Sequence, residues 1–188
     1  EYLQVIGICT SEHTANAAAA GGHLDLIRYL HNHGIHCTSY GANLAAWHGQ
    51  LATVHELRAH GIHCTLHGAD AAARWGYLDI VHDLRECGIH CTSDGVDNAA
   101  SQGLLHVIQD LRAHNIHGSS EAAHNAAIAG HVDVVRDLRA HGIHCSSQSA
   151  NKAALAGHFD VVEDLRLHGI DCSSRAADDA AARGDLSL

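Results

Sequence analysis

Apolar and polar positions along the chain follow a pattern that repeats every 27 residues. In each unit an alanine-rich stretch, such as "GANLAAWHG" at 41–49, ends at a glycine, a residue suited to the left-handed conformation that closes a helix. A more amphipathic stretch follows, such as "GHVDVVRDLRAHG" at 130–142. Its Val132, Val135 and Leu138 fall on one side of a helix. The pattern therefore predicts two short helices in every unit.

Several positions of the register are invariant. The glycine that ends the first predicted helix recurs as Gly22, Gly49, Gly76, Gly103, Gly130, Gly157 and Gly184. An isoleucine recurs as Ile8, Ile35, Ile62, Ile89, Ile116, Ile143 and Ile170. Paired alanines recur at 45–46, 72–73, 99–100, 126–127, 153–154 and 180–181. Helices this short are not stable alone in water. The alanine pairs let neighbouring helices approach to about 8–10 Å, so the pattern predicts a stacked helical solenoid.

The stretch "AAIAGHVDVVRDLRAHGIHC" at 126–145 resembles the helix pair of the ankyrin repeat, with its "AA…GH…VV…L…HGA" spacing. The resemblance implies an all-α, ankyrin-like solenoid of helical hairpins. We expect a second-helix half-repeat at 1–14, six repeats at 15–176 and a first-helix half-repeat at 177–188. The resemblance also implies a non-enzymatic scaffold for protein–protein interaction.

Two features depart from the ankyrin pattern. The period is 27 residues rather than about 33, so we expect tight turns where that family has its β-hairpin fingers. The family's "TPLH" opening is also missing. Polar residues stand where that motif has its histidine, and we expect them to form a hydrogen-bonded ladder instead. They are Asn43, Asp70, Asp97, Asn151 and Asp178.

Charge narrows the class of partner. The chain has 21 acidic and 11 basic residues and a formal net charge of −10 with neutral histidines. Nucleic acids and anionic membranes bind basic surfaces, so neither is an expected partner. No apolar run approaches the ~20 residues of a membrane span, so we expect no membrane insertion. We expect a protein partner, either further copies of this chain joined head to tail or an unidentified protein.

The recurring string "AHGIHC" places histidine and cysteine close together, as metal sites do. On the repeat frame, however, the histidine before glycine lies at the end of the second helix. Equivalent cysteines in adjacent repeats would be about 10 Å apart, too far for a disulfide. Zinc requires four converging ligands, which a straight ladder does not offer. We therefore expect reduced thiols, no metal and no cofactor; a histidine-rich metal-binding protein is the less favoured alternative.

The same repetition argues against an enzyme, because a nucleophile and its base form one singular constellation. No phosphate loop or paired-carboxylate signature is present. Unpaired cysteines favour a reducing, cytoplasmic compartment, although an extracellular filament stays open.

Specificity in a solenoid resides in the positions that vary between repeats. Four variable columns lie on or just before the first helix, which lines the concave binding face of ankyrin-like proteins. Tryptophan, tyrosine and arginine, which often anchor interfaces, occur there. The candidate partner-binding residues are Tyr40, Leu44, Trp47, His48, His67, Arg74, Trp75 and Asn98. A second interpretation stays open, in which the large aromatic residues only fill gaps beside alanines.

The second helix carries a column of acids and, two residues later, a column of arginines. The acids are Glu56, Asp83, Asp110, Asp137 and Asp164, and the arginines are Arg58, Arg85, Arg112, Arg139 and Arg166. Stacking would place them in parallel ladders that can pair between repeats. We interpret them as a solvated face rather than a lateral contact surface, because exposed pairs contribute only about 0–1 kcal/mol each.

The two ends of the chain carry complementary halves of one repeat. Residues 177–188 and 1–14 total 26 residues, one fewer than a repeat. Joined as "GDLSL" and "EYLQVIGIC", they match "GHLDLIRYLHNHGIHC" with only the equivalent of Ile27 missing. The candidate self-assembly residues are Tyr2, Leu3, Val5, Ile6, Ala180, Ala181, Leu186 and Leu188. Either the two halves dock to propagate a filament, or the chain is a window cut from a longer array. The alternative function is a monomeric adaptor that presents the face of Trp47 and Trp75 to one protein partner.

Histidine content generates a first prediction. The chain has 21 histidines, so its net charge should change from negative to positive between roughly pH 7 and pH 5. We expect a solubility minimum or self-association near pH 6, measured by light scattering during a pH titration. Scattering that stays flat across this range would contradict the prediction.

Overall fold

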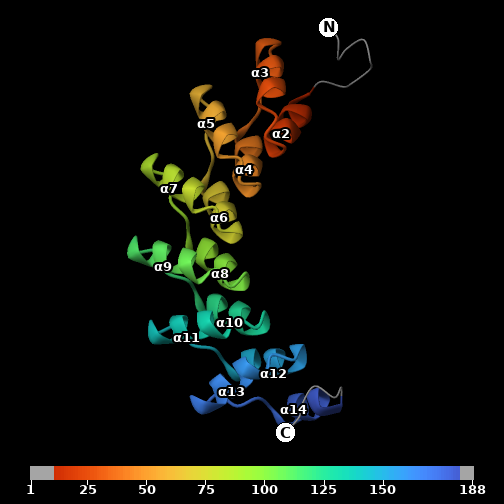
Figure 1. Cartoon of the computed structure of the whole chain (residues 1–188), viewed down its shortest axis with the longest axis vertical. Coiled ribbons are helices and arrows are strands. Elements are labelled where there is room, and N and C mark those ends of the chain that lie inside the picture. The colour runs from red at the N-terminus through yellow and green to blue at the C-terminus, as the bar shows by residue number, and fades with distance from the viewer. Residues whose placement is uncertain (1–10, 183–188) are drawn as a thin grey trace. The chain divides into compact units, whose positions relative to one another are not determined.

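In the computed structural model, residues 11–182 are described, and all their regular secondary structure is helical (Figure 1). The first helices of the successive hairpins are α2 (Glu12–Ala20), α4 (Ser39–Trp47), α6 (Leu66–Trp75), α8 (Ser93–Ser101), α10 (Ser120–Ile128), α12 (Ser147–Ala156) and α14 (Ser174–Ala182). The second helices are α3 (Leu24–Asn32), α5 (Leu51–Ala59), α7 (Leu78–Glu86), α9 (Leu105–Ala113), α11 (Val132–Ala140) and α13 (Phe159–Leu167). The all-α prediction is confirmed. Short turns, without strands, connect the helices of this range, as expected from the reduced period.

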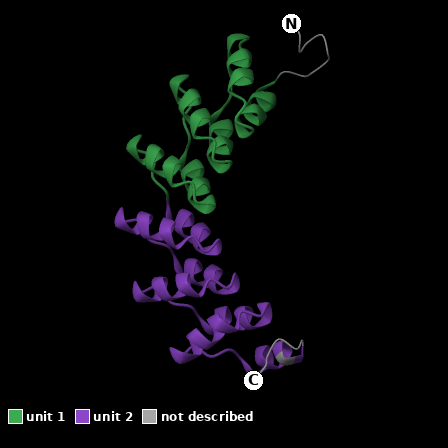
Figure 2. Ribbon diagram, in the orientation of Figure 1, with its two compact units in different colours: residues 1–91 green, residues 92–188 purple. Residues whose placement is uncertain are grey.

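The chain divides into two compact units, residues 1–91 and 92–188 (Figure 2). In the first unit α4 packs between α2 and α6, and each second helix packs on the first helix before it. In the second unit α8, α10, α12 and α14 pack in succession in the same way, and α11 contacts both α9 and α13. Each unit is therefore a stack of helical hairpins. The predicted boundaries between half-repeats and full repeats stay predictions.

Alanines from the first helices and branched residues from the second form the core. The alanine pair at 126–127 is fully buried, and Leu138 of the facing second helix is 1% exposed. On α11 the buried residues are Val134, Val135 and Leu138, whereas Val132 is half-buried. The prediction is therefore correct for Val135 and Leu138 but wrong for Val132, which begins the helix and is only half-buried, and Val134 takes its place in the core.

The expected polar ladder is present within both units. The backbone N–H of Thr65 donates to Asn43 Oδ1 at 2.9 Å, and that of Ser119 donates to Asp97 Oδ1 at 2.8 Å. Ser173 donates to Asn151 in the same way at 2.7 Å. In each pair the acceptor lies on one first helix and the donor starts the next, 22 residues later. The ladder therefore fixes the spacing of neighbouring hairpins.

The histidine of "AHGIHC" closes the second helix. In α11, His141 Nδ1 lies 2.8 Å from the carbonyl oxygen of Asp137, and His114 and His168 make the equivalent contact. A carbonyl oxygen only accepts, so Nδ1 must carry the proton in these three rings. The histidine is thus a helix cap at these positions, as the register predicted.

The cysteine of the same string packs against the preceding repeat. Cys64 Sγ donates to the carbonyl oxygen of Ala42 at 3.3 Å, and Cys145 Sγ donates to that of Ala123 at 3.2 Å. Burial raises the pKa of each of these two thiols to about 11. The six cysteines in the described residues are all free.

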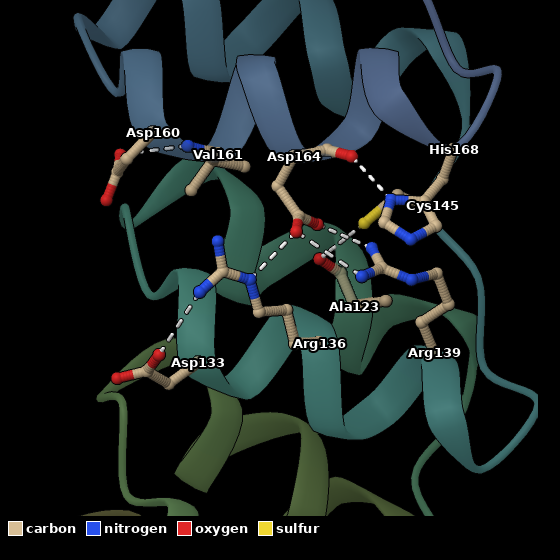
Figure 3. A network of polar contacts seen from close by, with 9 residues as sticks. All are labelled: Ala123, Asp133, Arg136, Arg139, Cys145, Asp160, Val161, Asp164 and His168. Atoms are coloured by element: carbon tan, nitrogen blue, oxygen red, sulfur yellow. Dashed lines mark hydrogen bonds and ion pairs between the residues drawn. The ribbon is translucent and has the colours of Figure 1, made fainter.

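Acidic side chains of one second helix accept hydrogen bonds from basic side chains of the preceding second helix (Figure 3). Asp164 accepts from Arg139 Nη1 at 2.5 Å and from Arg136 Nε at 2.8 Å. In the first unit Asp83 accepts from Arg58 Nη1 at 2.7 Å and from His55 Nε2 at 2.8 Å. Each carboxylate therefore receives two donors that lie three residues apart on one helix.

This arrangement corrects the interpretation of the acids as a solvated face. Asp164 is only 5% exposed, because the two arginine side chains cover it. Its burial by itself would raise the pKa, but hydrogen bonds from Arg139 and Arg136 outweigh this and lower the pKa. For Asp83 the hydrogen bond from Arg58 has the largest effect, and the pKa is again lowered. The stabilisation is therefore present above the ordinary carboxyl pKa and is lost as the pH falls through the lowered value.

Asp164→Ala tests the weight of this contact. It leaves two arginines without their carboxylate, so we expect the free energy of unfolding to fall by about 2–3 kcal/mol. Urea unfolding followed by circular dichroism measures the change. Asp133→Ala is the matched control, since that carboxylate is 80% exposed and pairs with Arg136 only at 3.9 Å. Its loss should cost less than about 1 kcal/mol. Equal losses in the two variants would show that the buried contact adds nothing.

Candidate functional site

Two neighbouring first helices of the first unit expose aromatic side chains. On α4, Tyr40, Leu44 and Trp47 are spaced by four and three residues, which places them on one face of the helix. Tyr40 is 62% exposed, and Trp47 is 40% exposed. On α6, Trp75 is 43% exposed. We call the surface formed by Tyr40, Leu44, Trp47, His67, Arg74 and Trp75 the aromatic face.

Arg74 connects the two indoles of the aromatic face. Its guanidinium carbon lies 5.8 Å from the ring centroid of Trp47 and 5.7 Å from that of Trp75. The indoles themselves meet edge to face, with centroids 5.8 Å apart and planes at 61°. Cation–π contacts at such distances are favourable and orient the cation. The two rings are therefore arranged before any partner arrives.

A cavity of about 490 Å³ lies beside these rings. Its lining residues are Tyr40, Asn43, Leu44, Trp47, His67 and Ala71. The amide of Asn43 is already used by Thr65, which bonds both its Oδ1 and its Nδ2 at 2.9 Å. A ligand side chain in this cavity would thus meet mainly aromatic and aliphatic carbon. Its volume lies within the range of clefts that bind small ligands.

The structure assigns different positions to the remaining predicted residues. His48 caps α4, and its Nδ1 lies 2.8 Å from the carbonyl oxygen of Leu44. Asn98 is half-buried on α8, in the second unit, and is not a member of the aromatic face. Residues 1–10 and 183–188, and with them most predicted self-assembly residues, lie outside the described residues. Ala180 is fully buried in its own chain, so its side chain is not accessible to a docking copy.

Leu66 is an exposed apolar residue that the variable columns missed. It is 46% exposed at the start of α6. Five other repeats have serine at this position, at Ser39, Ser93, Ser120, Ser147 and Ser174, and the first described hairpin has Glu12. The replacement of serine by leucine was the feature of the sequence that could have identified Leu66 as a candidate interface residue.

The described residues contain no group of three or more histidine, cysteine, aspartate or glutamate side chains placed to hold a metal ion. None of the helices in residues 11–182 is long and apolar enough to span a lipid bilayer.

Comparison with known proteins identifies the architecture. Residues 123–166 match the family model described as ankyrin repeats (many copies). The crystal structure of the human ASB11 ankyrin repeat domain superimposes with a TM-score of 0.65, over 93% of this chain and 98% of that domain, at 17% sequence identity. The fold is that of the ankyrin repeats. Ankyrin repeats are generally non-enzymatic scaffolds for protein–protein interaction.

A second solved structure shows how far helical hairpins resemble one another. The pentatricopeptide repeat protein PPR10 from maize matches 94% of this chain and 32% of its own length, with a TM-score of 0.50 and 15% identity. The ankyrin repeat domain has the higher TM-score, and nearly the whole of that domain is matched. No curated protein sequence matches the chain. The aromatic face lies outside the residues that match the ankyrin repeat model.

Proposed function

We propose that the chain is a non-enzymatic ankyrin-repeat scaffold that binds a protein partner through the aromatic face. The observation that carries the proposal is the exposure of two preoriented tryptophans beside a largely apolar cavity. Tryptophan, tyrosine and arginine provide most of the energy in many protein interfaces. The alternative role of the tryptophans, as fillers beside alanines, accounts poorly for side chains that remain 40% and 43% exposed.

Charge around the aromatic face favours a particular type of segment. Arg74, His48 and His67 are the ionisable side chains on or beside it that can be positive, whereas the whole chain has a net charge of −10. Apolar side chains would enter the cavity, and an acidic group would lie near Arg74. The partner we propose is therefore a protein segment with apolar anchors next to an acidic residue.

Peptide display provides a test because the partner itself is unidentified. Peptides selected on the immobilised chain should lose at least about 30-fold in affinity when Trp47 and Trp75 are both changed to alanine, since interface tryptophans contribute about 2 kcal/mol or more. Trp47 and Trp75 are the only tryptophans in the chain, so a blue shift of intrinsic fluorescence reports binding by the parent chain. Anisotropy of the labelled peptide measures affinity in the parent chain and in the variants, including the one that lacks tryptophan.

The matched control changes the column of Trp47 in the second unit, as Ile128→Ala with Leu155→Ala, because the equivalents of Trp75 in those two repeats are already alanine. This variant should keep the affinity of the parent chain. The proposal fails if the two double variants, both folded by circular dichroism, bind the selected peptides equally well.

A second proposal concerns the ends of the sequence. Residues 177–188 and 1–14 provide complementary halves of one hairpin, and this complementarity supports head-to-tail association of copies. The docking surface would use the apolar residues Leu3, Val5 and Ile6 at one end and Leu186 and Leu188 at the other.

Leu3→Asp with Ile6→Asp tests this second proposal. Charged side chains in the docking surface should abolish polymerisation, because each carboxylate would be buried without a partner. Multi-angle light scattering at high protein concentration measures the assembly state. A parent chain that stays a monodisperse monomer at high concentration would rule the filament out.

A further inference from the structure

One position in the arginine column departs from the register. The second helices carry arginine at Arg58, Arg85, Arg112, Arg139 and Arg166, but the first described hairpin has His31 there. The turn five residues later carries histidine in five successive repeats, at His36, His63, His90, His117 and His144. Only His31 and His36 therefore juxtapose two histidines in this part of the register. We call them the histidine pair.

The histidine pair is held close together. His31 is half-buried in the last turn of α3, and His36 is exposed in the turn that follows. Their Nδ1 atoms are 3.0 Å apart, and their ring centroids are 4.5 Å apart with planes at 76°. Neither Nδ1 is bonded to a backbone carbonyl in the way that His33 Nδ1 is bonded to that of Tyr29. Both nitrogens therefore face one another instead of capping a helix.

The distance between the two nitrogens suits a shared metal ion. Imidazole nitrogens bind transition metals at about 2.0–2.1 Å, and adjacent ligands at about 90–109° then lie about 2.9–3.4 Å apart. Neutral imidazole is a preferred ligand of Cu²⁺, Ni²⁺ and Zn²⁺. We propose that the histidine pair chelates one such divalent transition-metal ion through the two Nδ1 atoms, with water in the remaining positions. The proton that one ring now carries on Nδ1 moves through solvent to Nε2, so no proton is lost.

The surroundings of the pair support this assignment. The ring of His60, from the next repeat, stacks on His31 with centroids 3.9 Å apart and planes at 27°, which restricts the orientation of His31. The nearby carboxylate of Glu56 is engaged by Arg28, with contacts of 2.7 and 2.8 Å. It is therefore bound already and is not needed as a metal ligand.

The equivalent positions in other repeats show why only this hairpin has the histidine pair. In the second unit Arg112 Nη1 lies 3.1 Å from His141 Nε2, and in the first unit Arg58 Nη1 lies 2.9 Å from Cys87 Sγ. A guanidinium at this position repels a metal cation and has no free electron pair to donate. His31 replaces that fixed positive charge with a neutral base. The repeated cysteines and histidines lie in separate repeats, whereas His31 and His36 lie within one hairpin.

The test uses Cu²⁺, because it binds nitrogen ligands most tightly of these ions. Calorimetric titration of the whole chain in a non-coordinating buffer should show one tightest site. The electron paramagnetic resonance spectrum of that site should show coupling to two imidazole nitrogens. His31→Arg should weaken the tightest step at least tenfold and remove this spectrum. It restores the residue that five other repeats carry, so the fold is expected to persist, and circular dichroism checks this.

Two further variants make the test specific. His63→Ala removes a turn histidine that lies five residues after an arginine, and it should leave the tightest Cu²⁺ site unchanged. Arg139→His places a second histidine five residues before His144 and removes one donor to Asp164, so circular dichroism first checks that this variant is folded. The folded variant should have two tight sites in place of one. The proposal is overturned if folded His31→Arg binds Cu²⁺ as tightly as the parent chain, or if the parent spectrum shows a single nitrogen.

Discussion

The structure depends on the close packing of alanine pairs between neighbouring hairpins. A nine-residue helix such as α10 is too short to persist in water alone. Its alanines at 126–127 are fully buried, which shows that adjacent helices cover them completely. Small side chains bring the backbones near enough for polar groups to reach across. The carboxamide of Asn43 and the carboxylate of Asp97 can therefore bond the next turn directly.

Polar contacts between repeats add direction to this apolar stacking. Asn43 and Asp97 fix the first-helix side of each hairpin, and carboxylates such as Asp164 fix the second-helix side. The two sets act on different helices of the hairpin. Sliding or tilting of one hairpin against the next would break both, whereas alanine packing alone would tolerate small shifts.

Much of the fold could be predicted from the sequence because it depends on periodic features. Glycine and alanine positions defined both helices of each hairpin, and the cap role of His141 followed from its place before glycine. The burial of Asp164 could not be predicted in this way. A charged residue in a regular column looks solvated, and only the three-dimensional reach of Arg136 and Arg139 reveals that it is covered. For the candidate site, the variable columns located Trp47 and Trp75, but their mutual arrangement around Arg74 depends on side-chain rotamers that periodicity does not encode.

The 22-residue offset of the polar ladder has an evolutionary consequence. Asn43 bonds Thr65, and Asn151 bonds Ser173, so donor and acceptor always belong to consecutive hairpins. A duplication or deletion of one whole 27-residue unit within a stack recreates the same junction at the new boundary. Unequal recombination can thus lengthen or shorten such a gene without leaving a mismatched joint. The identity of "LRAHGIHC" at 57–64 and 138–145 is the trace that this kind of copying would leave.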